Sequence, residues 1–265
     1  MSVLSFDIGG SKIAYALVDA KGTLQTEVVT KSTPQTADEI EQILQDATTQ
    51  YKYDACAIAT AGIVFKNKLQ GKPNNLPKGY ENIDWSAIFK APYIIENDAN
   101  AAMYAEYQIG NMRGAKNGIM LTLGTDIGCG LICNGSILRG KCGATGEVSF
   151  HFSGRSLKRM AEEHGSNLTD CFEIYEAAKL GDTRARAAYY EWEENLISGL
   201  KLLNGLLDTE RFVLSGSLSR IVDYAKVNTA LALLQPYNPA EVKPAICGTA
   251  AGIIGAALLY VDGLQ

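Results

Sequence analysis

The first sixty residues alternate apolar runs with short polar breaks in an order that predicts strand, strand, helix and strand. Residues 3–6 and 13–18 are β-prone runs joined by a glycine-containing turn. Residues 37–51 place apolar side chains at helical spacing after a Ser-Thr-Pro break, and residues 55–60 form a run typical of a buried strand. This order indicates a protein of the α/β class.

The middle of the chain is predicted to carry a strand-to-helix junction at Asp98. The apolar, β-prone residues 93–95 come just before it, and good helix formers follow it to about residue 107. The preceding region 66–84 is rich in Asn, Gly, Lys and Pro and is predicted to be a loop. Because α/β enzymes commonly expose their reactive groups at such junctions, Asp98 is a candidate functional residue.

A second strand hairpin is predicted farther along the chain. Residues 118–123 form a strand pattern that ends at the glycine-rich stretch 124–130, which we expect to be a loop between strands. Asn134-Gly135 then predicts a tight two-residue turn. The similar order of elements around Asp7 and Gly124 predicts two similarly built lobes.

From Ser153 onward the pattern becomes mainly helical. Ser153 is a candidate N-cap for a helix ending at His164, and residues 182–207 carry a long amphipathic pattern. A strand is expected at residues 211–214. Near the C-terminus, a glycine turn at 247–252 precedes an apolar helix that we expect to begin at Ile253 and to end at about Leu264.

The composition is that of an ordinary globular protein and excludes several function classes. The 265 residues are 47% hydrophobic and 20% charged, with a net charge of −5. A net negative charge does not favour binding to nucleic acid or to an anionic membrane. No apolar stretch approaches the roughly 18 to 20 residues that span a bilayer, and a strand pattern at Met1 leaves no visible signal peptide. We therefore expect a cytoplasmic protein.

Cysteine and histidine usage predicts no structural zinc site. The six cysteines are scattered without a CxxC pair, and the chain has only two histidines. Cys129 is expected inside the glycine loop and Cys133 in the following strand, which is poor geometry for a zinc knuckle. Buried free thiols are the favoured interpretation.

Four glycine-containing turns, each at the end of a predicted strand or the start of a helix, indicate a phosphate-binding function. Glycine lets backbone N–H groups approach an anion closely, and a carboxylate at Asp7 could hold Mg²⁺ through water with Lys12 nearby. A hairpin turn without any ligand is the alternative for each turn taken alone. Together they favour a bound nucleotide, and they lie at residues 7–12, 124–130, 215–217 and 248–252.

Several longer stretches, in order along the chain, resemble sugar kinases of the ROK family, within the actin-like, hexokinase-like ATPase superfamily. The resemblance covers nearly the whole chain. The matching stretches are Phe6–Lys12, Pro73–Pro77, Glu96–Ala102, Leu123–Gly130, Gly143–Glu147, Ser215–Ser217 and Ala251–Ala257.

The resemblance implies a two-lobed actin-like (ribonuclease H-like) α/β fold with the active site in the interlobe cleft. The N-terminal lobe would span residues 1–108 and be joined by the C-terminal helix, about 253–265. The larger second lobe would span 109–252, and a homodimer through its helices is expected from the family. Repressors of the family carry an N-terminal helix-turn-helix, for which a strand starting at Val3 leaves no room, so no nucleic-acid partner is expected.

The resemblance also implies roles for individual residues, with ATP and Mg²⁺ as cofactors. Asp98 would be the general base that takes the proton of a sugar hydroxyl, usually the 6-hydroxyl; the alternative for Asp98 is a helix N-cap. Asn97, Glu147 and Asn75, or its neighbour Asn74, would bind the sugar. The groups around the ATP phosphates and Mg²⁺ would be Asp7, Gly9, Gly10, Ser11, Lys12, Gly124 and Thr125, with Gly216 near the adenosine.

The chain departs from the family pattern after Glu147. The family usually continues with Gly-His, a zinc-binding Cys-rich loop and a second Glu before Ser-Gly. Here Phe150 stands where the His is expected, and the zinc loop and second Glu are absent. His151 comes one residue late, and on a strand this offset turns a side chain to the other face. His151 either swings into the sugar site or is a packed or surface residue, and the latter is favoured.

These observations predict an ATP-dependent kinase of a hexose or N-acylhexosamine, such as glucose or N-acetylmannosamine. A catalytically weak or inactive sugar-binding sensor of the same fold is the alternative. Acetate- or glycerol-type kinases are disfavoured by the combination of Asn97, Asp98 and Glu147.

Overall fold

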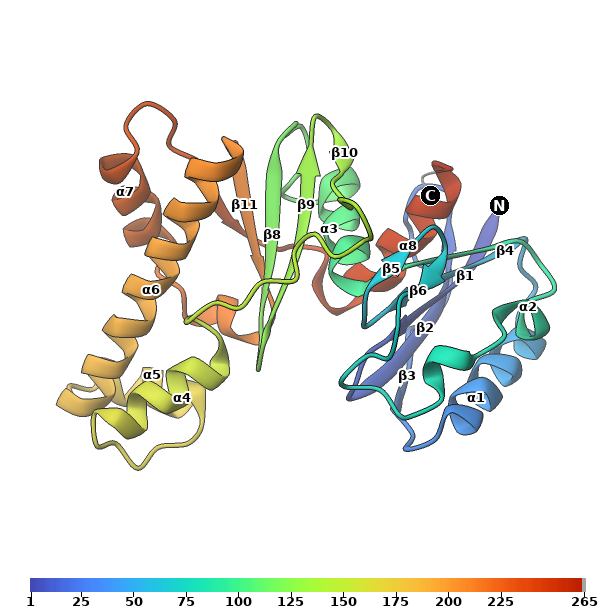
Figure 1. The fold of residues 1–265 in the computed structure, drawn as a ribbon, viewed down its shortest axis with the longest axis horizontal. Coiled ribbons are helices and arrows are strands. Elements are labelled where there is room, and N and C mark those ends of the chain that lie inside the picture. The colour runs from blue at the N-terminus through green and yellow to red at the C-terminus, as the bar shows by residue number, and fades with distance from the viewer. Residues whose placement is uncertain (264–265) are drawn as a thin grey trace. The chain divides into compact units, whose positions relative to one another are not determined.

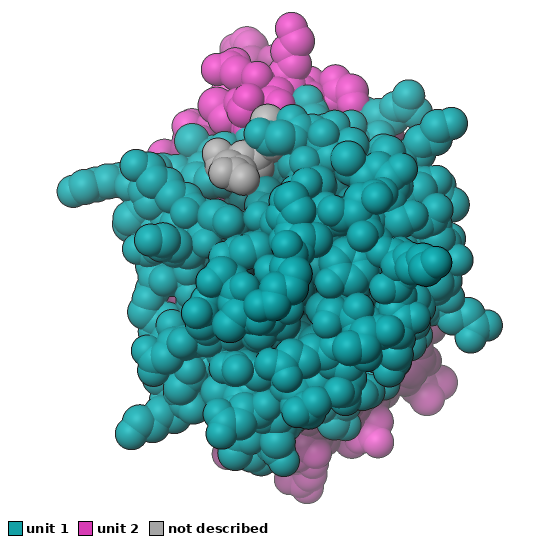
Figure 2. Space-filling model, turned by 90° about the vertical axis from the view of Figure 1, so that its right-hand side faces the viewer, with its two compact units in different colours: residues 1–113, 137–145, 246–265 teal, residues 114–136, 146–245 magenta. Residues whose placement is uncertain are grey.

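The computed structural model describes residues 1–263, which form two compact units (Figures 1 and 2). Unit 1, teal in Figure 2, contains residues 1–113, 137–145 and those from 246 onward. Unit 2, magenta, contains residues 114–136 and 146–245. Each unit is therefore built from segments that are distant in sequence.

Unit 1 is organised around a five-stranded sheet in which three neighbouring strands are parallel. β1 (Ser2–Ile8) pairs in antiparallel fashion with β2 (Lys12–Asp19), and β2 pairs likewise with β3 (Val29–Ser32). On its other side, β1 pairs in parallel with β4 (Ala55–Thr60), and β4 with β7 (Tyr93–Asn97). The carboxyl ends of β1, β4 and β7 thus meet at one edge of the sheet.

The two faces of this sheet are covered by different helices because side chains alternate along β1. Leu4, Phe6 and Ile8 contribute to the buried core shared with α1 (Ala37–Gln50) and α2 (Trp85–Ile88). Ser5 points to the other face, where its hydroxyl donates to the carbonyl of Ile253 at 2.6 Å. That carbonyl belongs to α8 (Ala251–Val261), which follows the short turn η3 (Gly248–Ala250).

Helix α8 is apolar on every side, as expected for a helix buried all round. It packs against α3 (Asp98–Ile109) so closely that a Cβ at Gly255 would lie 1.6 Å from the carbonyl oxygen of Ala101. The fully buried carboxylate of Glu106, also on α3, accepts hydrogen bonds from the backbone N–H groups of Ile246 and Cys247 at 2.7 and 2.6 Å. These contacts hold the C-terminal segment on α3.

Unit 2 repeats the strand order of unit 1, which confirms the prediction of two similarly built parts. Its sheet has the order β10-β9-β8-β11-β12, with β8 antiparallel to β9 and parallel to β11. The strands are β8 (Gly118–Leu123), β9 (Ile127–Cys133), β10 (Ser136–Ile137), β11 (Arg211–Ser215) and β12 (Glu241–Pro244). The helices are α4 (Gly154–Glu163), α5 (Cys171–Lys179), α6 (Thr183–Leu207) and α7 (Tyr224–Leu234).

Local signals in the sequence located several elements correctly. Ser153 caps α4 by accepting a hydrogen bond from the backbone of Ser156. The amphipathic pattern predicted at residues 182–207 corresponds to α6. Asn134 and Gly135 have φ values of 51° and 77°, as a tight hairpin turn with two left-handed residues requires. The predicted loop 66–84 is interrupted by a short hairpin, β5 (Val64–Phe65) and β6 (Lys68–Leu69), and by the turn η1 (Tyr80–Asn82).

The glycine-rich stretch 124–130 is not the seven-residue loop predicted from the sequence. Leu123 pairs with Ile127, so only residues 124–126 form the turn, and Cys129 lies in strand β9. Glycine is tolerated there because the ladder to β8 supplies the backbone hydrogen bonds. Helices α5 and α7 and strand β12 were not predicted, and the final helix begins at Ala251; its predicted end at Leu264 lies outside the described residues.

Within residues 1–263, no helix is both long enough and apolar enough to cross a membrane.

Replacing Gly255 by alanine is expected to destabilise unit 1, because the new methyl group would force α8 and α3 apart at Ala101. We expect the free energy of unfolding to fall by about 3 kcal/mol, which is at the upper end of the range for overpacking a core. Gly205 is the matched control, since it lies on α6, is exposed, and a Cβ there meets only the flexible Gln235 side chain at 3.7 Å. Gly205→Ala should be neutral or stabilising. Urea denaturation of the three proteins measures both effects, and equal stability of Gly255→Ala and wild type would contradict the packing described.

Candidate active site

Asn97, rather than Asp98, is the N-cap of helix α3. Its backbone is extended, and its Oδ1 atom accepts a hydrogen bond from the N–H of Asn100 at 3.0 Å. Asp98 is the first residue of the helix itself. The alternative interpretation of Asp98 as the capping residue is therefore wrong.

The carboxylate of Asp98 is oriented by its neighbours. Oδ1 of Asp98 accepts hydrogen bonds from the N–H of Ala99 at 2.8 Å and from Nδ2 of Asn97 at 3.2 Å. The same Nδ2 group also donates to the carbonyl of Gly62, just after β4, at 3.0 Å. Asn97 thus ties Asp98 to the end of the neighbouring parallel strand.

A pair of buried hydroxyl groups lies close to Asp98. The hydroxyls of Thr60 and Tyr80 are 2.6 Å apart, and both side chains are fully buried. Burial raises the pKa of Tyr80 above its ordinary value, and the negative charge of Asp98 raises it further. Burial therefore favours the neutral, hydrogen-bonding form of the Tyr80 hydroxyl.

The hairpin between β1 and β2 is shaped by a close approach at Gly10. Gly9 N–H donates to the carbonyl of Lys12 at 3.0 Å, and the Thr33 hydroxyl donates to the carbonyl of Gly9 at 2.6 Å. A Cβ at Gly10 would lie 2.6 Å from the backbone oxygen of Asn75, so only glycine fits there. This contact brings two residues selected from the sequence side by side, with Ser11 exposed between Gly10 and Lys12.

Asp7 carries a carboxylate that is poorly solvated. It lies at the end of β1 on the face covered by α8, where a Cβ on Gly252 would be 2.7 Å from its Oδ2 atom. Burial raises the pKa of Asp7 to about 6, and the nearby positive charge of Lys12 only partly opposes this. Among the residues that the structure describes, no cluster of three His, Cys, Asp or Glu side chains could hold a metal ion.

Unit 2 brings together the remaining predicted nucleotide-binding residues. Gly216 has a φ of 81°, and a Cβ there would lie 2.4 Å from the carbonyl oxygen of Leu123, which adjoins Gly124. The first amide of α4, at Gly154, donates to the carbonyl of Gly124 at 2.8 Å, and Arg155 N–H donates to that of Thr125 at 3.2 Å. The turn after β8, the end of β11 and the start of α4 are therefore in contact.

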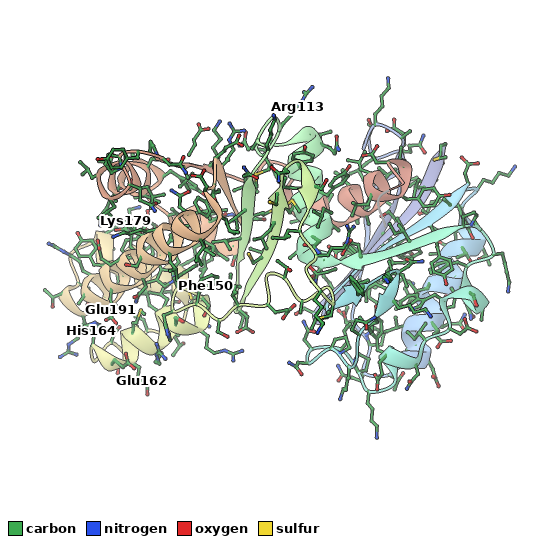
Figure 3. The ribbon with its side chains drawn as sticks, turned by 45° about the horizontal axis from the view of Figure 1, so that its top comes forward. Arg113, Phe150, Glu162, His164, Lys179 and Glu191 are labelled. Atoms are coloured by element: carbon green, nitrogen blue, oxygen red, sulfur yellow. The ribbon has the colours of Figure 1, made fainter. Side chains whose placement is uncertain are left out.

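The segment between Glu147 and α4 is irregular and is not a strand. Glu147 is exposed, and the preceding Gly146 packs against the carbonyl oxygen of Cys129. Phe150, labelled in Figure 3, is half-buried and stacks on Phe152 with ring centroids 4.8 Å apart. His151 lies exposed on the following turn. Because no strand is present, strand alternation does not determine which way the His151 side chain faces.

The structure thus gathers the predicted site residues, apart from Glu147 and His151, into one group in each unit. In unit 1, strand pairing and loop contacts collect Asp7, Gly9 to Lys12, Asn75, Asn97 and Asp98. In unit 2, Gly124, Thr125 and Gly216 are adjacent, and Glu147 stands apart from them beside β9. Sequence reasoning missed Thr60 and Tyr80, since a buried hydroxyl pair has no local pattern.

Comparison with known proteins places the chain in a family. A sequence model of the ROK family matches residues 3–152 and 141–262. The chain belongs to the ROK family. The two matched segments overlap at 141–152, in the stretch where the sequence departs from the family pattern.

Individual ROK proteins are similar over almost the entire chain. A glucokinase of Streptomyces coelicolor is 30% identical over 309 aligned residues, covering 96% of both chains. This alignment exceeds the 265 residues of the present chain, so the relative contains residues without a counterpart here. An N-acetylmannosamine kinase of Haemophilus influenzae is 27% identical, with 100% of this chain and 97% of the relative covered.

A solved structure supports the same relationship. The ROK family glucokinase of Streptomyces griseus, in complex with glucose and AMPPNP, is 26% identical, with a TM-score of 0.76 over 98% of this chain and 99% of that chain. The predicted α/β, actin-like (ribonuclease H-like) ATPase fold is therefore confirmed.

The metal-free Asp7→Asn variant is expected to be more stable than the wild type at pH 7.5. The pKa of Asp7 is raised from 3.8 to about 6 on folding. Between these two pH values the folded state binds more protons than the unfolded state, so the free energy of unfolding falls as the pH rises through this range. Above pH 6 the ionised carboxylate costs up to about 3 kcal/mol, which asparagine removes. The advantage should disappear near pH 4.

Denaturation with EDTA at pH 4, 5, 6 and 7.5 measures this difference. Asp38→Asn, at an exposed aspartate in the first turn of α1, serves as the control and should show no comparable pH dependence. An Asp7→Asn protein less stable than wild type at pH 7.5 would refute the desolvated state of this carboxylate.

Proposed function

We propose that this ROK protein is an ATP-dependent sugar kinase that transfers the γ-phosphoryl group to the 6-hydroxyl of a hexose or N-acylhexosamine. The observation that carries the proposal is the carboxylate of Asp98, held by Ala99 and Asn97 at the same sheet edge as Asp7 and the Gly9–Lys12 hairpin. The names of the relatives, glucokinase and N-acetylmannosamine kinase, support the same substrate class.

The glycine turns fit the phosphates of ATP. Gly10 lies against Asn75 and Gly216 against Leu123, so that a side chain at either position is excluded and the backbone alone forms the surface. Backbone N–H groups in such turns bind phosphate oxygens, and the exposed Lys12 can add a positive charge. Binding of AMPPNP to the similar glucokinase of Streptomyces griseus agrees with this role.

Asp7 fits a Mg²⁺ ion bound through water. Its oxygens are the ligand type that Mg²⁺ prefers, and its raised pKa shows a carboxylate that lacks compensating solvation. Mg²⁺ commonly keeps most of its waters and binds to one or two carboxylates together with substrate phosphates, so a single protein carboxylate is sufficient. When bound, the ion supplies neutralisation of charge on the phosphates.

Asp98 would act as the general base. The sugar hydroxyl loses its proton to a carboxylate oxygen of Asp98 while its oxygen bonds to the γ-phosphorus. The bond from that phosphorus to the bridging oxygen of ADP breaks, and ADP leaves with the electron pair. Because the transition state is loose, the base mainly orients the hydroxyl and takes its proton late.

Asn97 would contribute to this step through Asp98 as well as through the sugar. Both N–H groups of its amide are used, one by Gly62 and one by Asp98. Its Oδ1 atom accepts from Asn100 and has one further lone pair, which can accept a sugar hydroxyl. Asn75 and Glu147 are both exposed and remain proposed sugar ligands.

Asp98→Asn is expected to lower kcat by about 10² to 10⁴ with little change in the KM for ATP. Asparagine keeps the size of the side chain and can still accept from Ala99, so the helix start should be preserved. Asp38→Asn is the matched control, since Asp38 lies in the first turn of α1, and it should retain full activity.

A coupled assay of ATP turnover measures these constants over glucose, mannose, fructose, allose, N-acetylglucosamine and N-acetylmannosamine. Turnover that Asp98→Asn leaves unchanged would eliminate the assignment of the base. Absence of turnover on all six sugars, together with measurable ATP binding, would contradict the proposed activity.

A further inference from the structure

Arg139 and Glu96 form a largely buried ion pair in unit 1. Nε and Nη2 of Arg139 donate to Oε2 of Glu96 at 3.0 and 2.7 Å, and the two side chains are 20% and 3% exposed. The Arg159–Glu163 pair on α4 is far more exposed, at 53% and 58%. A pair shielded in this way is little screened by salt, and its geometry is fixed by hydrogen bonds.

The other oxygen of Glu96 contacts the residues that present Asp98. Oε1 accepts hydrogen bonds from the backbone N–H of Asn97 at 2.9 Å and from Nδ2 of Asn100 at 3.1 Å. Asn100 in turn donates its backbone N–H to the cap Asn97. A single carboxylate therefore bonds Arg139 on one side and the start of α3 on the other.

Arg139 belongs to the segment 137–145, here called the strap, which returns from unit 2 to unit 1. The strap is also held at its far end, where a Cβ on Gly143 would lie 2.2 Å from the carbonyl oxygen of Val64. It leads directly to Gly146 and Glu147. The ion pair thus connects the strap, which precedes the proposed sugar ligand Glu147, to Asn97, which caps α3 beside the proposed base Asp98.

We propose that the Arg139–Glu96 pair is a positioning device for the sugar site, one that sets Asn97 and Asp98 at the start of α3 and anchors the strap that precedes Glu147. This inference rests on the proposed kinase function. It predicts a change in the KM for the sugar and in kcat, but not in the KM for ATP. The reason is that the residues bonded to Glu96 lie at the start of α3 and not on the Gly9–Lys12 hairpin.

Arg139→Gln is expected to raise the KM for the best sugar at least tenfold and to lower kcat, with the KM for ATP within twofold of wild type. Arg139→Lys keeps a positive charge near Oε2 and should recover part of the loss. Arg159→Gln, which breaks an exposed pair on α4, should match wild type in all three constants.

A double-mutant cycle separates the pair from a general effect on folding. Glu96→Gln keeps an oxygen for the N–H of Asn97 but cannot pair with Arg139. When Arg139 has already been replaced by Gln, the buried carboxylate of Glu96 lacks its counter-charge, and Glu96→Gln removes that carboxylate. The sugar KM of the double variant should therefore be no higher than that of Arg139→Gln alone.

Chemical rescue provides a second measurement. The pair lines a small cavity together with Val64, Lys66, Asn67, Ile94 and Ile95. Arg139→Ala enlarges this cavity, so millimolar guanidinium chloride should restore part of the sugar affinity of this variant. It should leave Arg159→Gln unaffected, with sodium chloride as the ionic-strength control.

The outcomes distinguish the two levels of the proposal. If wild type phosphorylates a sugar but Arg139→Gln keeps its sugar KM and kcat, the positioning role is refuted and the kinase function stands. Equal losses of sugar and ATP affinity would likewise refute it in favour of general destabilisation. If wild type phosphorylates no sugar, the kinase function fails and this inference fails with it.

Discussion

Parallel pairing of β1, β4 and β7 is the constraint on which the arrangement of unit 1 depends. Ile8 pairs with Thr60, and Thr60 pairs with Asn97, so three chain segments separated by dozens of residues end at one edge. Each strand contributes a polar group there, Asp7 from β1, Thr60 from β4 and Asn97 from β7. A shift of register by one residue turns a side chain to the opposite face, so this pairing fixes which polar groups meet at the edge.

Unit 1 places several charged groups away from water, and their surroundings differ in a way that matches the roles proposed for them. Glu106 and Glu96 are satisfied by hydrogen-bond donors, so they act as fixed links between segments. Asp7 is instead left with a raised pKa. A carboxylate in that state is unfavourable for folding and suited to a cation, which is the trade-off expected at a binding site.

Local signals in the sequence were sufficient where a residue acts through its immediate neighbours. The cap at Ser153, the Asn134-Gly135 turn and the junction at Asp98 all depend on contacts within a few positions. Such signals were insufficient for the glycine-rich stretch after β8. Glycine is compatible with both loop and strand, and the pairing of Leu123 with Ile127 decided between them.

The sequence by itself determined the fold class, the family and the residue types that could carry phosphoryl transfer, because these follow from hydrophobic periodicity and from motifs in a fixed order. Only the tertiary structure decided which of those residues meet. Gly10 lies against Asn75, and Asp7 lies against Gly252, although the second pair is separated by most of the chain. Asn97 rather than Asp98 caps α3, and Arg139 finds Glu96 through the strap. Contacts of this kind depend on how strands and helices pack in space, and no spacing along the chain encodes them.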